Sequence, residues 1–420
     1  MSPSGASVAS AAPWPQAGFG PASFAGALQR TDEQIALGEE RVQNGPDQWL
    51  RQESLGRALI ARSRYSGSFD ELARASTVLD RAMTLAPKGS GPLLSAAVMA
   101  MMTHRLSQVE TALETIDRWA VPPDQADLAE ISGLRGDLAF YRGDSATASS
   151  HYSVSRNLGG GSGAYYRLAQ LEKTSGQFDR ALVLLRSAAR DPAMTTPFAL
   201  ASTAAQLGGV ELARGNYAEA WEWFETADRT FSGYWLFEAH LAQAMAIDGD
   251  IPGGIADMRR IAEQSGSAEV MDALAMLLRS NGEAAESRRW AARAGEIWQR
   301  RLSQLPEAAY GHAIEHELVF GTPDKAVALG RLNLAARPYG ESRILLASAL
   351  LAKGMTSEAL AQLALAQQSG WNSAPLHALR AQAHELAGDL AEAEQARAAA
   401  QALNPRIFDA ETALVWFSHG

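Results

Sequence analysis

The sequence predicts an all-α fold, built as a solenoid of stacked helical hairpins. Apolar residues make up 47% of the chain and aromatic residues only 7%, a composition that favours closely packed helices over a sheet core. Glycines recur along the chain at nearly constant spacing, and a small residue follows each of them five positions later. A period of this size is typical of helical repeat proteins, in which each hairpin packs on its neighbours.

The repeat is marked by eight glycines. Consecutive members of the series are separated by 33, 39, 34, 33, 39, 33 and 34 residues. The two longer steps cross proline-containing stretches at 191–197 and 305–306, which predicts longer loops between hairpins at both places. The glycines and the small residues that follow them are Gly143 with Ala148, Gly176 with Ala181, Gly215 with Ala220, Gly249 with Gly254, Gly282 with Ser287, Gly321 with Ala326, Gly354 with Ala359 and Gly388 with Ala393.

The residues around Gly215 resemble a known repeat. Gly208 stands seven residues before this glycine, and Tyr217, Phe224 and Ala227 follow it at two, nine and twelve residues. This pattern resembles the tetratricopeptide repeat (TPR) of bacterial type. The resemblance implies paired antiparallel helices that meet at the turn glycine, with small residues where they approach closely. It also implies a right-handed superhelix whose first helices line a concave groove.

The resemblance covers about residues 47–405 and is clearest from residue 129 onward. Gly254 and Ser287 depart from it, because alanine is usual at their position, and Pro323 stands where an aromatic residue is expected. Further strings that fit the template are RGDSATA at 142–148, SGQFDRA at 175–181, DGDIPGG at 248–254 and AGDLAEA at 387–393.

The pattern predicts ten hairpins, of which the first two are degenerate. In the second degenerate hairpin, His104 takes the place of the turn glycine. Thr31 stands three residues before Gln34 as in a capping box, which predicts a helix ahead of the hairpins. The expected segments are a disordered leader at 1–30, a leading helix at 31–46, two degenerate TPR-like hairpins at 47–122, eight hairpins at 123–405 and a C-terminal tail at 406–420.

The leader has two interpretations. Residues 1–30 are small, rich in proline and glycine, and uncharged up to Arg30, a composition that resists folding and suits a flexible leader. Ala9-Ser10-Ala11 has the small-x-small pattern of a signal cleavage site, which suits the remnant of an export signal. If the native gene begins upstream of Met1 with a basic, apolar extension, we expect a periplasmic or secreted protein, and otherwise a cytoplasmic one.

Charge and composition argue against several classes of function. The formal net charge of −10 opposes a phosphate-binding surface, so nucleic acid is not an expected partner. No stretch reaches the roughly 18 consecutive apolar residues that a membrane span requires. The chain has no cysteine and therefore no disulfide or thiolate metal site. GGGSG at 159–163 lacks the Lys-Ser/Thr of a phosphate loop, and no cofactor is expected.

One string has the pattern of a metal site. His312, Glu315 and His316 match H-x-x-E-H, in which two histidines four apart on a helix bind zinc and the glutamate acts on a metal-bound water. The string falls on the first helix of an ordinary hairpin, and such a site still needs a third ligand. Hydrogen bonding at the helix surface or between helices, adventitious or structural metal, and catalytic metal are the three alternatives.

An aromatic cluster at 221–224 also has two interpretations. Trp221, Trp223 and Phe224 fall on the second helix of a hairpin, where large side chains bury their area against neighbouring hairpins. We therefore expect them in the core, and a surface for stacking a ligand is the alternative.

The predicted function is a non-catalytic scaffold that binds a segment of another protein in the concave groove. A clamp for a terminal carboxylate needs several clustered cations, and the groove positions offer only Lys173 and Arg279. The alternative is a metal-dependent hydrolase or metal-handling protein that uses the 312–316 string. The oligomeric state stays open. The predicted groove residues are Asp137, Phe140, Tyr141, Tyr166, Gln170, Lys173, Gln243 and Arg279.

Overall fold

The fold is all-α, as the sequence predicts. The computed structural model describes residues 13–119, 122–191 and 196–417, and within these ranges it contains 21 α-helices and one 3₁₀ helix. The only β-type pairing in the same ranges is an isolated bridge between Ser23 and Ser232. The predicted cleavage pattern at 9–11 lies outside the described residues.

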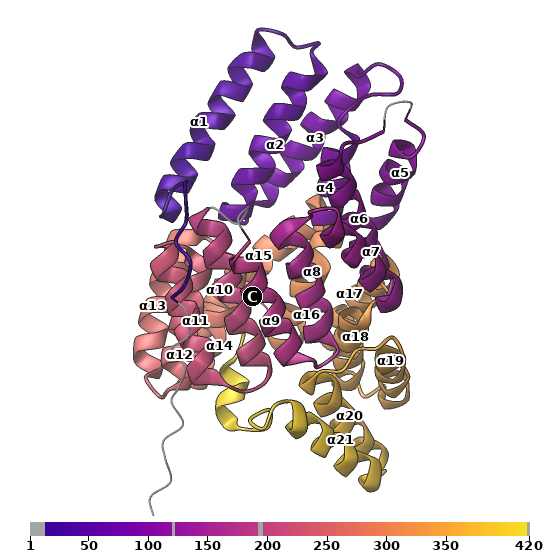
Figure 1. The fold of residues 1–420 in the computed structure, drawn as a ribbon. Helices are drawn as coiled ribbons and strands as arrows, with labels where there is room; N and C mark the ends of the chain where they lie inside the picture. The colour runs from indigo at the N-terminus through magenta and orange to yellow at the C-terminus, as the bar shows by residue number, and fades with distance from the viewer. Residues whose placement is uncertain (1–12, 120–121, 192–195, 418–420) are drawn as a thin grey trace, which may run out of the picture.

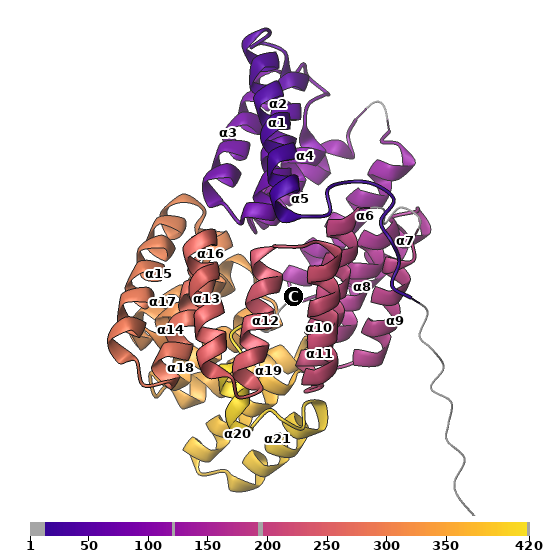
Figure 2. The same ribbon diagram turned by 90° about the vertical axis from the view of Figure 1, so that its left-hand side faces the viewer.

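The helices form a solenoid in which each odd-numbered helix from α3 onward packs against the helix before it (Figures 1 and 2). First helices also contact first helices of the next hairpin, as α4 does with α6 and α16 with α18, so they form the inner layer. The helices of the N-terminal half are α1 (Phe24–Gln43), α2 (Trp49–Ser66), α3 (Phe69–Leu85), α4 (Leu93–Met102), α5 (Leu106–Ile116), α6 (Gln125–Tyr141), α7 (Ser145–Asn157), α8 (Gly161–Thr174), α9 (Phe178–Ala189), α10 (Pro197–Ala213) and α11 (Tyr217–Thr230). Those of the C-terminal half are α12 (Trp235–Ile247), α13 (Ile251–Ser265), α14 (Ala268–Ser280), α15 (Ala284–Gln304), α16 (Pro306–Val319), α17 (Pro323–Ala336), α18 (Gly340–Ala352), α19 (Thr356–Gln368), α20 (Ala374–Ala387), α21 (Leu390–Leu403) and η1 (Ala410–Leu414).

The repeated glycines lie at the turns within the hairpins. Seven of the eight have a positive φ, between 76° at Gly176 and 102° at Gly249, which an L-residue adopts only with strain. Gly321 is the exception. The small residue five positions on is buried in every hairpin, and at Gly254 an added Cβ would lie 2.8 Å from the Ala242 carbonyl oxygen. The small residue five positions after each glycine therefore marks the place where the two helices of a hairpin are in contact.

His104 occupies the glycine position of the α4–α5 turn, as the degenerate repeat predicts. Its φ is 57°, in the left-handed region, and it has this conformation without being glycine. The imidazole lies edge-on to Tyr141, with 5.0 Å between ring centroids. Burial and the nearby Arg337 lower the pKa of His104 well below its ordinary value. The side chain is therefore a neutral part of the interior.

The prediction of a longer loop at 305–306 is wrong. The added residues lengthen α15, which has 21 residues, and α16 begins directly afterwards at Pro306. The helix continues because its apolar stripe does: Trp290 and Trp298 are buried, and the stripe leads to Leu305, which is 2% exposed and packs with residues of α2 and α3. The other stretch, 191–197, does separate α9 from α10, although residues 192–195 lie outside the described ranges.

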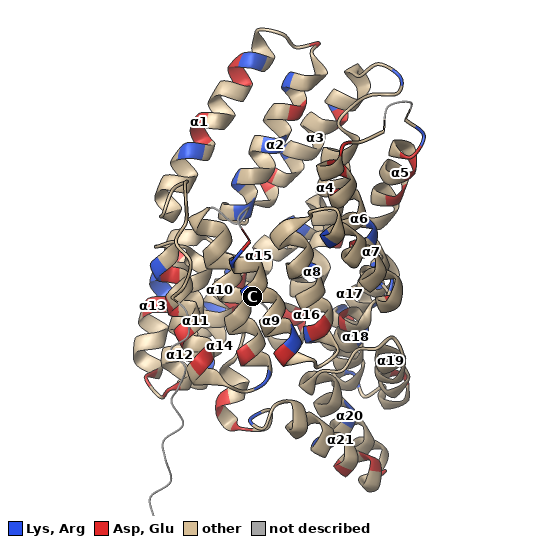
Figure 3. Cartoon of the chain, viewed as in Figure 1, with Lys and Arg blue, Asp and Glu red and all other residues tan. Residues whose placement is uncertain are grey.

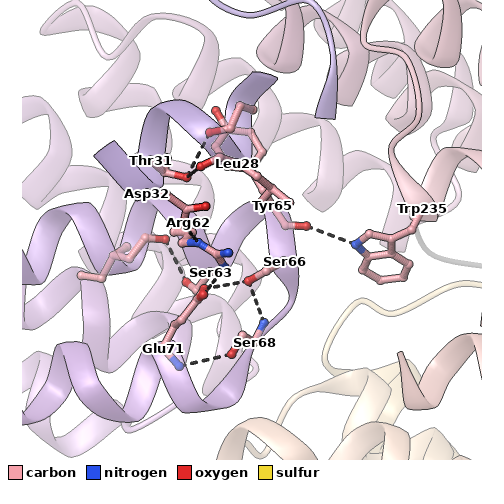
Figure 4. Close-up of polar contacts among 12 residues, drawn as sticks. Leu28, Thr31, Asp32, Arg62, Ser63, Tyr65, Ser66, Ser68, Glu71 and Trp235 are labelled. Carbon is pink, nitrogen blue, oxygen red and sulfur yellow. Dashed lines mark hydrogen bonds and ion pairs between the residues drawn. The ribbon is translucent and has the colours of Figure 1, made fainter. Parts of the chain in front are cut away.

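The superhelix is tight enough for one turn to touch the next. Near α2 and α3, Gln304 Nε2 donates to Asp70 Oδ1 at 2.7 Å, and the Arg301 guanidinium lies 4.6 Å from the centre of the Phe69 ring. Trp235 Nε1 donates to the Tyr65 carbonyl oxygen at 3.1 Å, joining the start of α12 to the end of α2 (Figure 4).

Similar contacts join hairpins further along the chain. The Asn372 amide, after α19, donates to the Thr174 carbonyl oxygen at the end of α8 at 2.8 Å. Ser145 Oγ donates to the Ser369 carbonyl oxygen at 3.1 Å. These bonds join distant hairpins around the predicted concave groove, which becomes a deep, partly open cavity.

The N-terminal boundary differs from the prediction, because α1 begins at Phe24, inside the predicted leader. Ser23 caps this helix by accepting a hydrogen bond from the Gly26 amide at 3.2 Å. The Phe24 amide donates to the Ser232 carbonyl oxygen, and Trp14 packs edge-on against Trp223 at 5.3 Å. Residues 13–23 are therefore held against the hairpins, and the apolar partners that hold them come from distant sequence.

Residues 406–417 of the predicted C-terminal tail are also part of the fold. After α21 the chain turns back toward the middle of the molecule (Figures 1 and 2) and forms the 3₁₀ helix η1. Phe417 is 5% exposed and belongs to the core cluster that includes α12 and α14. We call residues 404–417 the C-terminal segment.

Charges of both signs occur along α1 (Figure 3). Many pair between neighbouring helices, as Arg135 does with Asp117 and Arg142 with Glu110. Within the described residues, no helix is long and apolar enough to cross a membrane.

Candidate functional site: the central cavity

The touching turns border a central cavity of about 1270 Å³ that is partly open to solvent. Its walls come from the inner helices α6 and α8, from α16 and α18, and from the C-terminal segment, with Ile407, Thr412 and Val415 among the lining residues. Six of the eight predicted groove residues line it: Asp137, Phe140, Tyr141, Tyr166, Gln170 and Lys173.

Asp137 of α6 and Arg167 of α8 form a polar network on the side of the cavity made by these two helices. Arg167 Nε donates to both oxygens of Asp137 at 3.0 Å, and its Nη2 donates to Glu130 Oε1 at 3.0 Å. The Tyr152 hydroxyl donates to Asp137 Oδ1 at 3.0 Å. Gly136 makes this possible, because a Cβ there would lie 2.3 Å from the Tyr152 ring. The network fixes Asp137 in the wall, so this predicted contact residue is held by the protein itself.

Burial is the largest single influence on the pKa values of Asp137 and Arg167. It raises the pKa of Asp137, against the opposing effects of Arg167 and the Tyr152 hydrogen bond. Burial lowers the pKa of Arg167, but the carboxylates of Asp137 and Glu130 outweigh it and leave the value above the ordinary one. Arg167 therefore stays charged and holds the two carboxylates near the cavity.

Four aromatic rings from distant helices meet on one side of the cavity. Phe140 and Tyr141, at the end of α6, pack against Tyr339, with 5.7 and 5.1 Å between ring centroids. Trp371 completes the group at 5.7 Å from Tyr339. The Arg337 guanidinium lies 5.8 Å from the Tyr141 ring centre and 5.7 Å from that of Tyr339. The four rings give the cavity an apolar wall, and the Arg337 guanidinium lies next to two of them.

Lys173 of α8 and Glu341 of α18 both line the cavity. Burial lowers the pKa of Lys173 to about 8, an effect that Glu341 opposes. Burial and the nearby Glu315 raise the pKa of Glu341 to about 7, against the effects of Lys173 and Arg337. The cavity thus presents an acidic and a basic group whose pKa values lie close to neutral pH, beside aromatic rings. Such a surface suits a ligand that has both apolar and hydrogen-bonding parts.

Gln243 lies apart from the cavity and has a partner within the chain. Its Oε1 accepts from the amides of Trp416 and Phe417 at 2.7 and 2.8 Å. Its Nε2 donates to the Phe417 carbonyl oxygen at 3.3 Å. Gln243, which the repeat places on the concave face, therefore binds the backbone of the C-terminal segment through hydrogen bonds.

Two further predicted groove residues, Tyr166 and Arg279, behave differently. Tyr166 is 39% exposed, and its hydroxyl accepts a hydrogen bond from Gln170 at 3.1 Å. Arg279 does not line the cavity: its Nη1 donates to the Val319 carbonyl oxygen at 3.0 Å, and its guanidinium lies over the Phe320 ring. Tyr166 is thus presented to the cavity, whereas Arg279 is engaged at the end of α16.

The 312–316 string does not assemble as a metal site. His316 is buried, and its Nδ1 is hydrogen-bonded to Asp272 Oδ1 at 2.8 Å, whereas His312 lines the cavity and bonds to Glu315 at 2.9 Å. Across the described part of the chain, no group of three or more potential ligand side chains is gathered. The helical spacing was right, but the two imidazoles bond to different partners.

The cluster at 221–224 is mainly core, as expected. Trp221 and Phe224 belong to a buried cluster, in which Phe224 stacks on His240 at 4.0 Å. Trp223 is half-buried and covered by Trp14.

Sequence reasoning missed the far wall of the cavity. Arg337, Tyr339, Glu341 and Trp371 belong to hairpins far from α6, and only the closure of the superhelix brings them there. The repeat does carry a signal for Glu315, because this residue stands six positions before the turn glycine, as Asp137 and Gln170 do in their repeats.

Comparison with known proteins gives weak similarities. No protein-family profile matches the chain, and no curated sequence matches it. Among solved structures, yeast Tom70 is similar at 14% identity and a TM-score of 0.42, over 93% of this chain and 89% of that one. A monomeric mutant of IFIT1 with Gppp-AAAA gives 13% and 0.40, covering 89% and 95%, and the TPR domain of P58(IPK) gives 12% and 0.29, covering 86% and 95%. Similarity this low carries no inference about ligands or partners.

Proposed function

We propose that the protein is a non-catalytic scaffold that binds an extended segment of a partner protein on its concave face. The observation that carries the proposal is the Gln243 side chain, which forms three hydrogen bonds to the backbone of residues 416–417. Backbone recognition of this kind suits an extended peptide, since its amides and carbonyls are otherwise unpaired.

The central cavity supports the same function. Its aromatic rings, with Lys173 and Glu341, offer both apolar area and hydrogen-bonding groups. Aromatic side chains that become desolvated tend to dominate interface energies, at about 2 kcal/mol or more for a hot spot. Tyr166 is the side chain that a partner would cover first, because 39% of it is exposed.

The test uses a partner captured by the full-length chain from native cells and then purified. We expect Tyr166→Ala and Lys173→Ala to weaken its binding by tenfold or more, at about 1.4 kcal/mol for each factor of ten. The matched control is Val183→Ala on α9, a side chain 61% exposed that does not line the cavity. If both cavity variants bind as tightly as wild type and Val183→Ala abolishes binding, the partner lies on the outer helices and the proposal fails.

A further inference from the structure

The C-terminal segment lies on the concave face in the manner of a bound peptide. Its start is fixed by Asn404, whose side chain lies against the α10–α11 turn: a Cβ on Gly215 would come within 2.3 Å of the Asn404 Oδ1. Next, the Arg406 guanidinium stacks over the Tyr217 ring at 4.3 Å, and Thr412 Oγ1 is hydrogen-bonded to the Tyr217 hydroxyl at 2.8 Å. These contacts are all made to the α10–α11 hairpin, whereas the segment follows the α20–α21 hairpin.

Two aromatic side chains anchor the far end of the segment. Phe417 is 5% exposed, with its ring 5.5 Å from that of His240 on α12. Trp416 packs against the same core cluster and lies near Phe320, at 6.2 Å between centroids. Val415 has the backbone angles of extended chain, and the backbone of the next two residues is bonded to Gln243.

This arrangement separates two kinds of recognition. The Gln243 carboxamide bonds only to backbone atoms and so accepts any extended sequence. Trp416 and Phe417 pack with apolar residues of α12, α14 and α16, and these surroundings, which we call the two pockets, suit two adjacent bulky apolar side chains. Nothing in these contacts requires the segment to belong to the same hairpin stack, apart from its covalent connection to α21.

We propose that the face around Gln243 is a docking site for an extended partner segment with two adjacent aromatic residues, and that residues 415–417 occupy it in competition. This inference rests on the proposed scaffold function and names the chemistry of its partner. Because the C-terminal segment also lines the central cavity through Ile407, Thr412 and Val415, its displacement opens that cavity. A partner that docks at Gln243 thereby gains access to both surfaces.

Because the C-terminal segment is tethered to α21, it weakens the apparent affinity of any peptide that competes for the site. A segment joined by a short connection competes at an effective concentration on the order of millimolar, so a peptide in solution binds the occupied site much more weakly than an emptied one. For a peptide that binds the emptied site with a Kd of about 10 μM, the expected weakening in the wild-type chain is about 100-fold.

The experiment uses the full-length chain and a fluorescent peptide of residues 411–417, ETALVWF, as the probe. The double variant Trp416→Ala/Phe417→Ala empties the two pockets, and we expect it to bind the probe about 100-fold more tightly than wild type. Adding Gln243→Leu to this variant removes the backbone hydrogen bonds and should abolish that gain. The matched control is Phe408→Ala, an exposed aromatic of the same segment, which should bind the probe as wild type does.

A second measurement covers the case in which the double variant does not fold. In wild type, the amides of residues 416 and 417 donate to Gln243, and saturating probe should speed their hydrogen exchange by displacing them. A folded double variant that binds the probe no better than wild type overturns the inference, as does unchanged exchange at saturating probe. A captured partner that is lost with Tyr166→Ala but unaffected by Gln243→Leu overturns this docking site alone and leaves the scaffold function standing.

Discussion

His316 and Asp272 form a buried hydrogen-bonded pair, with 2.8 Å between Nδ1 and Oδ1, that joins α16 to α14. The other oxygen of Asp272 accepts from Trp298 Nε1 of α15 at 2.8 Å, so one carboxyl group connects three helices. Burial raises the pKa of Asp272, against the opposing effects of His316 and Trp298. A histidine that the sequence places in a metal motif is thereby used to hold two hairpins together.

Replacing Asp272 by alanine should destabilise the protein. It leaves His316 and Trp298 each without a buried partner, at about 1–3 kcal/mol for each unpaired group, measured by urea unfolding. Asp257→Ala, at a half-exposed acid on α13, is the control and should change the free energy of unfolding little. In the same assay, zinc should stabilise wild type no more than it stabilises His312→Ala; a histidine-dependent zinc effect would revive the metal site.

Ala220→Leu should overpack the α10–α11 hairpin. Ala220 is fully buried, and its carbonyl oxygen is already 3.1 Å from the position of a Cβ built on Gly208. The added volume should lower the free energy of unfolding by about 1–3 kcal/mol. Ala218→Leu, on the exposed side of the same helix, should cost little. Equal stability of the two variants in thermal unfolding would contradict the assigned repeat register.

Glu341→Gln should change how stability depends on pH. The folded-state pKa of Glu341, about 7, lies above its ordinary value of 4.5, so between these values the folded protein binds more protons than the unfolded chain. The free energy of unfolding of wild type therefore falls as pH rises through this window, and the glutamine variant lacks this contribution.

We expect Glu341→Gln to gain stability relative to wild type between about pH 5 and about pH 8, as measured by urea unfolding at both values. Glu392→Gln, at an exposed position of α21, is the control and should keep the wild-type profile. Parallel profiles for Glu341→Gln and wild type would show that this carboxyl group titrates as an ordinary glutamate.

Leu305→Ala should weaken the closure between turns of the superhelix. Leu305 is 2% exposed and packs in the cluster of α2 and α3, so its truncation should cost about 2–5 kcal/mol and increase the radius of gyration in solution scattering. Leu332→Ala, at a side chain 51% exposed on α17, is the control. A destabilised variant with unchanged dimensions would mean that the remaining contacts hold the turns together without Leu305.

The sequence by itself determined the repeated unit. A glycine with a small residue five positions later specifies a local geometry, a left-handed turn followed by a close helix crossing, and this geometry depends only on nearby residues. It therefore predicted the hairpins, the position of His104 in a turn and the side chains of α6 and α8 that face inward.

The tertiary structure alone decided what the repeats enclose. Small rotations between hairpins add up along the chain, and their sum brings Tyr339 and Trp371 against Phe140, Leu305 against α2 and Phe417 against Gln243. No local pattern records that sum, so the sequence predicted a concave groove and a C-terminal tail but not the distant residues that each of them contacts. Burial of the partly apolar C-terminal segment against α12 and α14 instead places this segment on the concave face, where it lines part of the central cavity.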